Sequence, residues 1–271
     1  MSLRQFWGAS LKFCTLVAKR FDEDGCFYRA AALAYTTLLS LVPLLAVSFA
    51  SLTVFPLFQS LGNQVQNFVF KNFIPAAAET VQGYLQQFLS QVSHLSVIGL
   101  FALIFTAITV LYTIEQTFNT IWRVHKPRRR MLALLLYWAV LTLAPLVIGL
   151  GFAASNHFLT LPWVAQFTQT FSLSGFIFAI VPFFLTATAF SALYIVIPNC
   201  PVRIRDGLIG GMVAAIFFET AKFGFSLYIK MFPTYELIYG ALAAIPVFLV
   251  WIYLCWLIIL LGAEISHAIS N

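Results

Sequence analysis

Six continuous apolar segments constrain the fold of this chain more than any other feature. Each contains 20 or more residues, which is the length that a helix needs to cross a hydrocarbon layer of about 30 Å. They lie at residues 30–55, 95–114, 131–153, 174–197, 207–229 and 241–265. A membrane β-barrel would instead show alternating segments of about ten residues. The segments therefore predict an all-α, polytopic membrane protein in which residues 1–271 form one domain with six transmembrane helices.

Composition excludes the other broad classes of protein. Hydrophobic residues make up 61% of the chain and charged residues only 9%, whereas soluble domains carry about 25% charged residues. A soluble enzyme, a disordered chain and a disulfide-stapled secreted domain are all excluded on this ground. The four cysteines form no CxxC pair, and the four histidines form no metal-binding motif. We therefore expect no metal site and no cofactor.

The positive charges predict how the chain is oriented in the membrane. Five Lys and Arg residues lie in residues 1–29, five in 115–130 and two in 198–206, and the predicted spans place all of them on one side. The opposite side carries only Lys71 and Lys230. Because basic loops remain on the cytoplasmic side, we predict a multi-pass protein with both termini in the cytoplasm.

Two amphipathic segments flank the first span. Residues 1–29 alternate apolar and basic side chains and predict a cytoplasmic helix that lies in the membrane interface. Residues 56–94 carry apolar side chains at roughly helical spacing among Gln and Asn, which favours a periplasmic or interfacial helical connection. The alternative is that this connection re-enters the membrane against protein.

Proline occurs inside four of the predicted spans, at Pro43, Pro145, Pro182 and Pro246. Each proline removes one helical hydrogen bond and favours a kink. In a membrane the freed carbonyl must find a partner inside the protein. We therefore predict several kinked helices whose kinks face the bundle.

Two charged residues lie about halfway along the fifth span. Glu219 and Lys222 are three residues apart and therefore share one helix face. Charges at this depth are costly unless they are paired, and they mark functional sites by default. We expect the two to pair, either as part of a substrate-binding or ion-binding site or as a structural pair that orients the bundle. Two glycines of the same span, Gly207 and Gly211, predict close internal helix packing.

Further charged and polar residues map to the cytoplasmic ends of the spans. Glu115 and Asn119 share a helical stripe at the end of the second span and are further candidates for substrate binding. Another six residues predict a cytoplasmic charge network: Arg29, Arg123, Arg203, Arg205, Asp206 and Glu264. Such a network either locks the cytoplasmic ends together or forms a gate or headgroup site.

The densest basic segment runs from Arg123 to Arg130. Its place beside two spans is typical of a topology signal, and it suits contact with the anionic headgroups of membrane lipids. Nucleic-acid binding is the less favoured reading of this segment. We therefore expect membrane lipids as partners, together with an envelope protein as a further candidate, and no nucleic acid.

The sequence resembles the YihY/BrkB family of bacterial inner-membrane proteins over nearly its whole length. The matching stretches are AALAYTTLLSLVPLL at 31–45, TIEQTFNTIWRV at 113–124, YWAVLTLAPL at 137–146, IPN at 197–199, RDGLIGGMVAAIFFETAKFGFSLYI at 205–229 and YELIYGALAAIPVFLVWIYLCWLIILLGAEI at 235–265. The resemblance implies a six-helix protein of the bacterial inner membrane. It supplies no catalytic residue.

The resemblance also implies a choice between functions. Members have carried a ribonuclease BN label, which the absence of a histidine cluster and of a soluble tRNA-binding surface argues against. Other relatives are linked to virulence and to envelope lipid transport. We expect a transport or lipid-handling role in the cell envelope. The alternatives are a membrane assembly or interaction protein without a transport cycle, and a membrane-embedded enzyme.

Overall fold

A computed structural model describes residues 3–53, 97–124, 128, 131–139, 174–231 and 244–270. Within these residues the regular structure is entirely helical, as the apolar segments predict. The long helices are α1 (Leu3–Glu23), α2 (Cys26–Thr53), α6 (Val97–Ile121), α9 (Ser174–Val196), α10 (Ile204–Met231) and α12 (Ala244–Ser270). Residues 131–139 form a further short helix.

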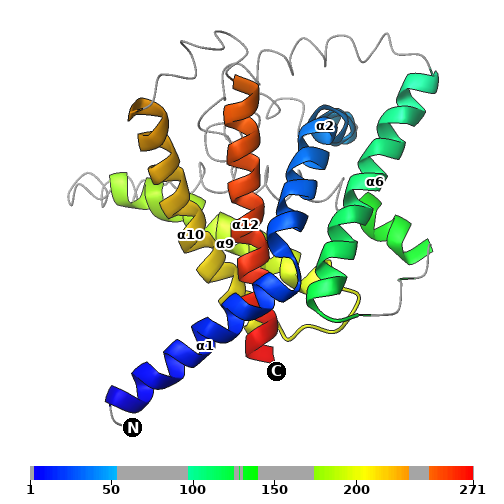
Figure 1. Ribbon diagram of the computed structural model, residues 1–271. Helices are drawn as coiled ribbons and strands as arrows, with labels where there is room; N and C mark the ends of the chain where they lie inside the picture. Colours follow the sequence, from blue (N-terminus) through cyan, green and yellow to red (C-terminus); the bar gives the residue numbers. More distant parts are fainter. Residues whose placement is uncertain are drawn as a thin grey trace, which may run out of the picture.

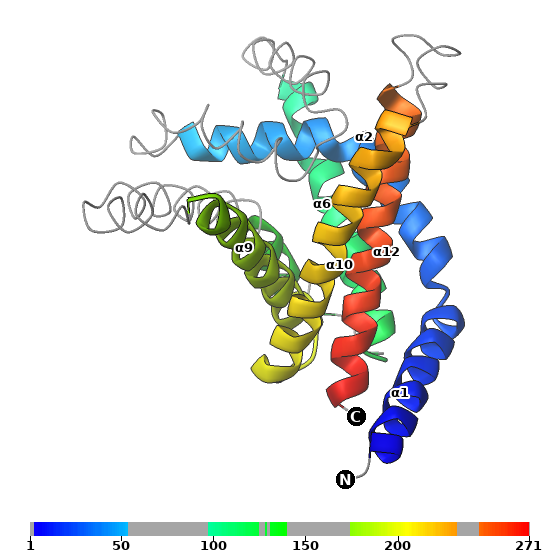
Figure 2. The same cartoon turned by 90° about the vertical axis from the view of Figure 1, so that its left-hand side faces the viewer.

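Helix α12 is the central element of the bundle. It contacts α1, α2, α6, α9 and α10, while α9 packs mainly on α10 and α6 packs mainly on α2. Figure 1 shows the resulting order, with α10 and α9 on one side of α12 and with α2 and α6 on the other. Both ends of the chain lie at the same end of the bundle, where α1 runs outward beside the end of α12 (Figures 1 and 2).

Helix α2 is strongly bent. Figure 2 shows that its first part runs along the bundle and that its second part turns away at a steep angle. Pro43 lies in this helix and cannot donate the backbone hydrogen bond that would hold the preceding turn straight. Pro182 lies inside α9 and Pro246 in the first turn of α12, whereas Pro145 falls outside the described residues.

Glycines allow α10 to approach two neighbouring helices closely. A Cβ atom added at Gly210 would lie 2.7 Å from the carbonyl oxygen of Gly262 in α12. One added at Gly207 or Gly211 would meet side chains of α9, from Ile195 and Ser191 respectively. The small residues of α10 therefore form an internal packing surface, as predicted, and the close approach buries aromatic residues between the three helices.

The outer face of the bundle is apolar. Large exposed side chains include Phe101, Phe105, Phe184 and Phe223, each more than half exposed. Exposed threonine hydroxyls on the same helices donate to the carbonyl four residues earlier, as at Thr109, Thr188 and Thr220. A hydroxyl satisfied by its own helix can face hydrocarbon at little cost, so this surface suits a lipid environment.

The helices agree with most of the predicted spans and correct some of their limits. α10 and α12 are long and apolar enough to cross a membrane, at Ile204–Ile229 and Ile245–Ser270. The second predicted span ended at residue 114, but α6 continues to Ile121 through a polar stretch. The third predicted span is described only over 131–139, and the connection 56–94 lies outside the described residues. Six membrane crossings remain a prediction.

Candidate functional site

A buried polar cluster lies where the first and last helices meet the end of α6. It consists of Asp24, Cys26, Arg29, Arg123 and Glu264, and we call it the terminal junction. Arg123 Nη1 lies 2.9 Å from Oδ1 of Asp24, and Arg29 Nε donates to the main-chain oxygen of Asp24 at 2.8 Å. The Cys26 thiol donates to Oε1 of Glu264 at 3.8 Å, and the Glu264 carboxyl interacts with that of Asp24. The junction thus joins α1, α2, α6 and α12.

Two residues in the left-handed conformation shape this junction. Gly25, with φ of 62°, ends α1 and starts α2 within a two-residue turn, which points Asp24 inward. Arg123, with φ of 56°, ends α6, and the amide of Val124 closes the turn by donating to the Asn119 carbonyl at 2.8 Å. Glycine would adopt this conformation at lower cost. Arg123 therefore adopts an unfavourable backbone conformation, and the ion pair with Asp24 offsets the free-energy cost of that conformation.

A second polar cluster ties α6 to the following helix and to the segment between α9 and α10. Arg128 Nε lies 3.6 Å from Oε1 of Glu115, and the Tyr137 hydroxyl donates to Oε2 of Glu115 at 2.6 Å. A terminal nitrogen of Arg128 also donates to the Pro198 carbonyl at 3.1 Å. Because Glu115 and Arg128 are both largely buried, we call this group the Arg128 cluster and regard it as structural.

Asn119 reinforces the same connection. Its side-chain oxygen accepts a hydrogen bond from the Asn199 amide at 2.8 Å, and the residue is buried. Both carboxylate oxygens of Glu115 and the side-chain oxygen of Asn119 are therefore engaged in contacts within the protein. Their geometry favours a structural role over substrate binding.

The pair on α10 has a different character. Lys222 Nζ lies 2.7 Å from Oε1 of Glu219 and 5.4 Å from the ring centre of Phe218. The side chains of Glu219 and Lys222 are 36% and 16% exposed, so the pair lies at the edge of the core, although Oε1 of Glu219 is buried. Both charges lie on α10, so within the described part of the chain this ion pair joins no second helix.

The six residues of the predicted charge network do not all meet. Arg29, Arg123 and Glu264 come together around Asp24 in the terminal junction. Arg203 and Arg205 are exposed, on either side of the point where α10 begins. Asp206 is buried in the first turn of α10, where a carboxylate interacts favourably with the helix dipole.

Sequence reasoning missed the residues on which both clusters depend. Asp24 and Cys26 are not among the candidates that the sequence offers, and Arg128 enters the sequence analysis only as part of the basic segment from Arg123 to Arg130. Tyr137 is likewise absent from the candidates, because a single tyrosine in an apolar segment carries no specific signal. The Asp24–Gly25 dipeptide, a strong turn signal, was the one local indication that the chain reverses here.

Burial changes the chemistry of the Cys26 thiol. Loss of solvent, together with the nearby carboxylates of Glu264 and Asp24, raises the pKa of Cys26 from 9.0 to about 12. Burial also raises the pKa of Cys200. Because the thiolate is the reactive form, Cys26 is expected to be inert in the folded protein, whereas Cys14 is exposed on α1.

We predict that a maleimide at pH 7 labels Cys14 within minutes and leaves Cys26 unlabelled until the protein unfolds. The raised pKa also predicts a pH effect, because the unfolded thiol ionises near 9.0 while the folded one stays protonated to about 12. The free energy of unfolding should therefore fall as the pH rises between these values. Single-cysteine variants and peptide mass mapping check the labelling. Rapid native labelling of Cys26 would contradict its burial.

The described residues offer no recognisable metal centre. Among them, no group of three or more His, Cys, Asp or Glu side chains is arranged to hold a metal ion. The terminal junction contains two carboxyls and one thiol, but the Asp24 carboxylate is already paired with the Arg123 guanidinium and Glu264 accepts from the Cys26 thiol.

Comparison with known proteins identifies similar membrane proteins. Residues 17–271 match the family described as "Virulence factor BrkB". The chain is 49% identical over 259 residues to a "UPF0761 membrane protein" of Legionella pneumophila, covering 96% of this chain and 62% of that protein. It is 44% identical over 270 residues to one of Azotobacter vinelandii, covering 99% and 65%. The chain therefore spans less than two thirds of the length of these relatives, and no solved structure matches it.

Proposed function

The chain belongs to the BrkB family of membrane proteins, and on that premise we propose that it handles an amphiphilic cargo in the bacterial inner membrane. Both termini are placed in the cytoplasm in this proposal, because the basic segments gather on one side of the spans. Glu219 and Lys222 form the polar part of the cargo site. The cargo is a lipid or lipid-like molecule that moves or is held within the cell envelope.

The observation that carries this proposal is the accessibility of the charge pair on α10. A pair that served only to orient the bundle would join two helices and would be sealed from outside. Glu219 and Lys222 instead lie on one helix and remain partly exposed, within a stretch long enough to span a membrane. An adjacent carboxylate and ammonium complement the charged headgroup of an amphiphile.

The second candidate function is a membrane assembly or interaction protein without a transport cycle. It is favoured by the terminal junction and the Arg128 cluster, whose contacts lock helix ends together. In either case, the basic segment from Arg123 to Arg130 is proposed to lie near anionic headgroups. The exposed half of the Arg123 side chain is available for that contact.

We expect native mass spectrometry of the protein extracted from its own membrane to detect a specific retained lipid. The Glu219→Gln/Lys222→Met variant should lose most of that lipid, because it lacks both charges at similar side-chain volume. Thr220→Val is the matched control, since Thr220 is exposed on the same helix and its hydroxyl bonds only to the Ile216 carbonyl at 2.8 Å. Equal retention in all three proteins would overturn the assignment of the site.

The pair also predicts a pattern of stability. Glu219→Leu alone should lower the melting temperature in detergent, because it leaves the Lys222 ammonium without its carboxylate inside a predicted span. Adding Lys222→Leu should restore much of the loss. If the single and double variants melt at the same temperature, the two charges are not coupled.

A further inference from the structure

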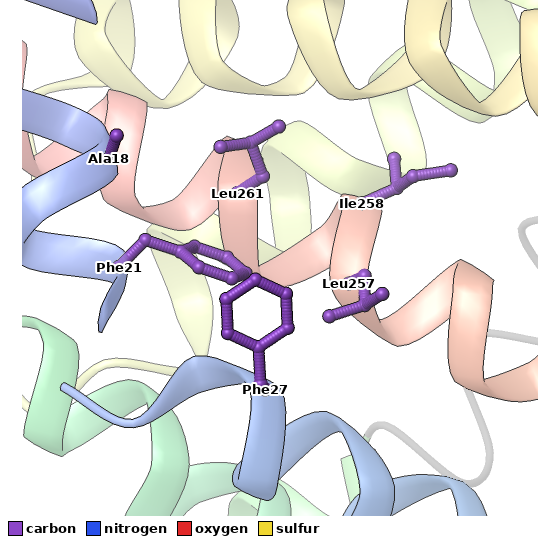
Figure 3. A pocket seen from close by; sticks show the side chains of 6 residues that line it. All are labelled: Ala18, Phe21, Phe27, Leu257, Ile258 and Leu261. Atoms are coloured by element: carbon purple, nitrogen blue, oxygen red, sulfur yellow. The ribbon is translucent and has the colours of Figure 1, made fainter. Parts of the chain in front are cut away.

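An open apolar groove lies between the first two helices and α12. Its volume is about 430 Å³, and Figure 3 shows the six side chains that line it: Ala18, Phe21, Phe27, Leu257, Ile258 and Leu261. The rings of Phe21 and Phe27 meet edge to face at 5.1 Å and form one wall. The lining offers no charged or hydrogen-bonding side chain, so an occupant must be hydrocarbon along its length.

The position of the groove along α12 defines its depth. Leu261 and Leu257 precede Glu264 of the terminal junction by three and seven residues. At 1.5 Å per residue, the groove extends from about 4 to about 10 Å beyond the buried carboxyl along the helix axis. It therefore begins directly beneath the polar end of the bundle, which is the depth at which acyl chains begin below their headgroups.

The turn of α1 that contributes Ala18 and Phe21 to the groove also carries two basic residues. Lys19 and Arg20 lie between these lining residues in the sequence, on neighbouring faces of the helix, and their long side chains can reach toward the rim of the groove. The Lys19 ammonium lies 3.6 Å from the Glu23 carboxylate, but both side chains are more than half exposed. An exposed pair of this kind is weak, so Lys19 remains available to an anionic group. One buried nitrogen of Arg20, Nη1, has no hydrogen-bond partner.

We propose that this groove binds one acyl chain of an anionic phospholipid, whose phosphate is held by Lys19 and Arg20. The apolar lining favours a hydrocarbon chain, and the depth of the groove favours a membrane lipid. Lys19 and Arg20, which we call the basic turn of α1, favour a negatively charged headgroup. The site is separate from Glu219 and Lys222, so it goes beyond the proposed function. A lipid held here braces α1 against α12.

The test fills the groove without disturbing the core. Ala18 is exposed, so Ala18→Trp should fold while its indole occupies the groove. Ala32→Trp is the matched control, because Ala32 is also an exposed helical alanine and points to another side of α2. Each protein is exchanged into detergent micelles with dioleoyl phosphatidylglycerol, and bound lipids are counted by native mass spectrometry.

Wild type and Ala32→Trp are expected to retain one more phosphatidylglycerol than Ala18→Trp. Replacing that lipid with dioleoyl phosphatidylcholine should lower occupancy at least threefold, and Lys19→Gln/Arg20→Gln should remove this preference. Equal retention by Ala18→Trp and wild type overturns the groove as the site. Equal binding of the two lipids by wild type overturns the role of the basic turn. Loss of lipid only in the Glu219→Gln/Lys222→Met variant would support the α10 site and reject this one.

Discussion

Replacing Glu115 with leucine is expected to lower the free energy of unfolding by about 3 to 5 kcal/mol, the usual effect of removing one partner from a buried ion pair. Glu115 is buried, and its carboxylate receives both the Arg128 guanidinium and the Tyr137 hydroxyl. Without it, the remaining partners of Arg128 among the described residues are the carbonyls of Ile197 and Pro198, and the hydroxyl loses its acceptor. The helix of residues 131–139 should then detach from α6.

Two variants separate charge from hydrogen bonding at this position. Glu115→Gln keeps an acceptor for Tyr137 and should lose less stability than Glu115→Leu. Glu115→Leu/Arg128→Met removes both charges and should recover part of the loss. Unfolding in detergent followed by tryptophan fluorescence measures all three proteins. Equal stability of Glu115→Leu and wild type would show that the Arg128 cluster is not a buried ion pair in the membrane.

Replacing Gly210 with alanine is expected to cost about 3 kcal/mol, at the upper end of the range for overpacking a close helix contact. The new methyl group would lie 2.7 Å from both the Gly262 carbonyl oxygen and the Ser266 Cβ. A backbone carbonyl cannot rotate away as a side chain does, so α10 and α12 must separate. Their separation would loosen the aromatic packing between Phe218 and Trp251.

Gly224 provides a control on the same helix. It also lies within α10, but in the described structure an added methyl group would meet no other atom within 4 Å beyond the adjacent backbone of its own helix. Gly224→Ala should therefore raise stability by about 0.5 to 1 kcal/mol through helix propensity alone. Thermal melts of the two variants in one detergent test the contrast. If Gly210→Ala melts no lower than Gly224→Ala, the close approach of α10 to α12 is wrong.

The helices could be predicted because an apolar run of about 20 residues has the length of a membrane-spanning helix. The runs 174–197 and 207–229 became α9 and α10 with small changes of limits. The end of α6 was harder, because its last two turns contain Glu115, Asn119 and several threonines. A hydropathy criterion ends the predicted span at the first polar residues. The helix itself continues as long as those residues find hydrogen-bond partners inside the protein.

In the candidate site, contacts between residues close in sequence could be predicted, whereas contacts between distant residues could not. Glu219 and Lys222 were predicted to pair because three residues of helix place them side by side, and they lie 2.7 Å apart. The terminal junction needs Asp24, Arg123 and Glu264 from three distant parts of the chain. No spacing rule connects such positions, since their meeting depends on how α2, α6 and α12 pack together.

The terminal junction also sets the time during synthesis at which its contacts can be completed. Cys26 and Glu264, which meet there, are 238 residues apart in the chain. At 5 to 20 residues per second, about 10 to 50 s separate their appearance from the ribosome. Arg123 is made partway through that interval, and from then on it can pair with Asp24 while the contacts that α12 provides are still missing. The turn between α1 and α2 is thus closed only when α12 has been made and inserted, so this part of the nascent chain stays incomplete until then.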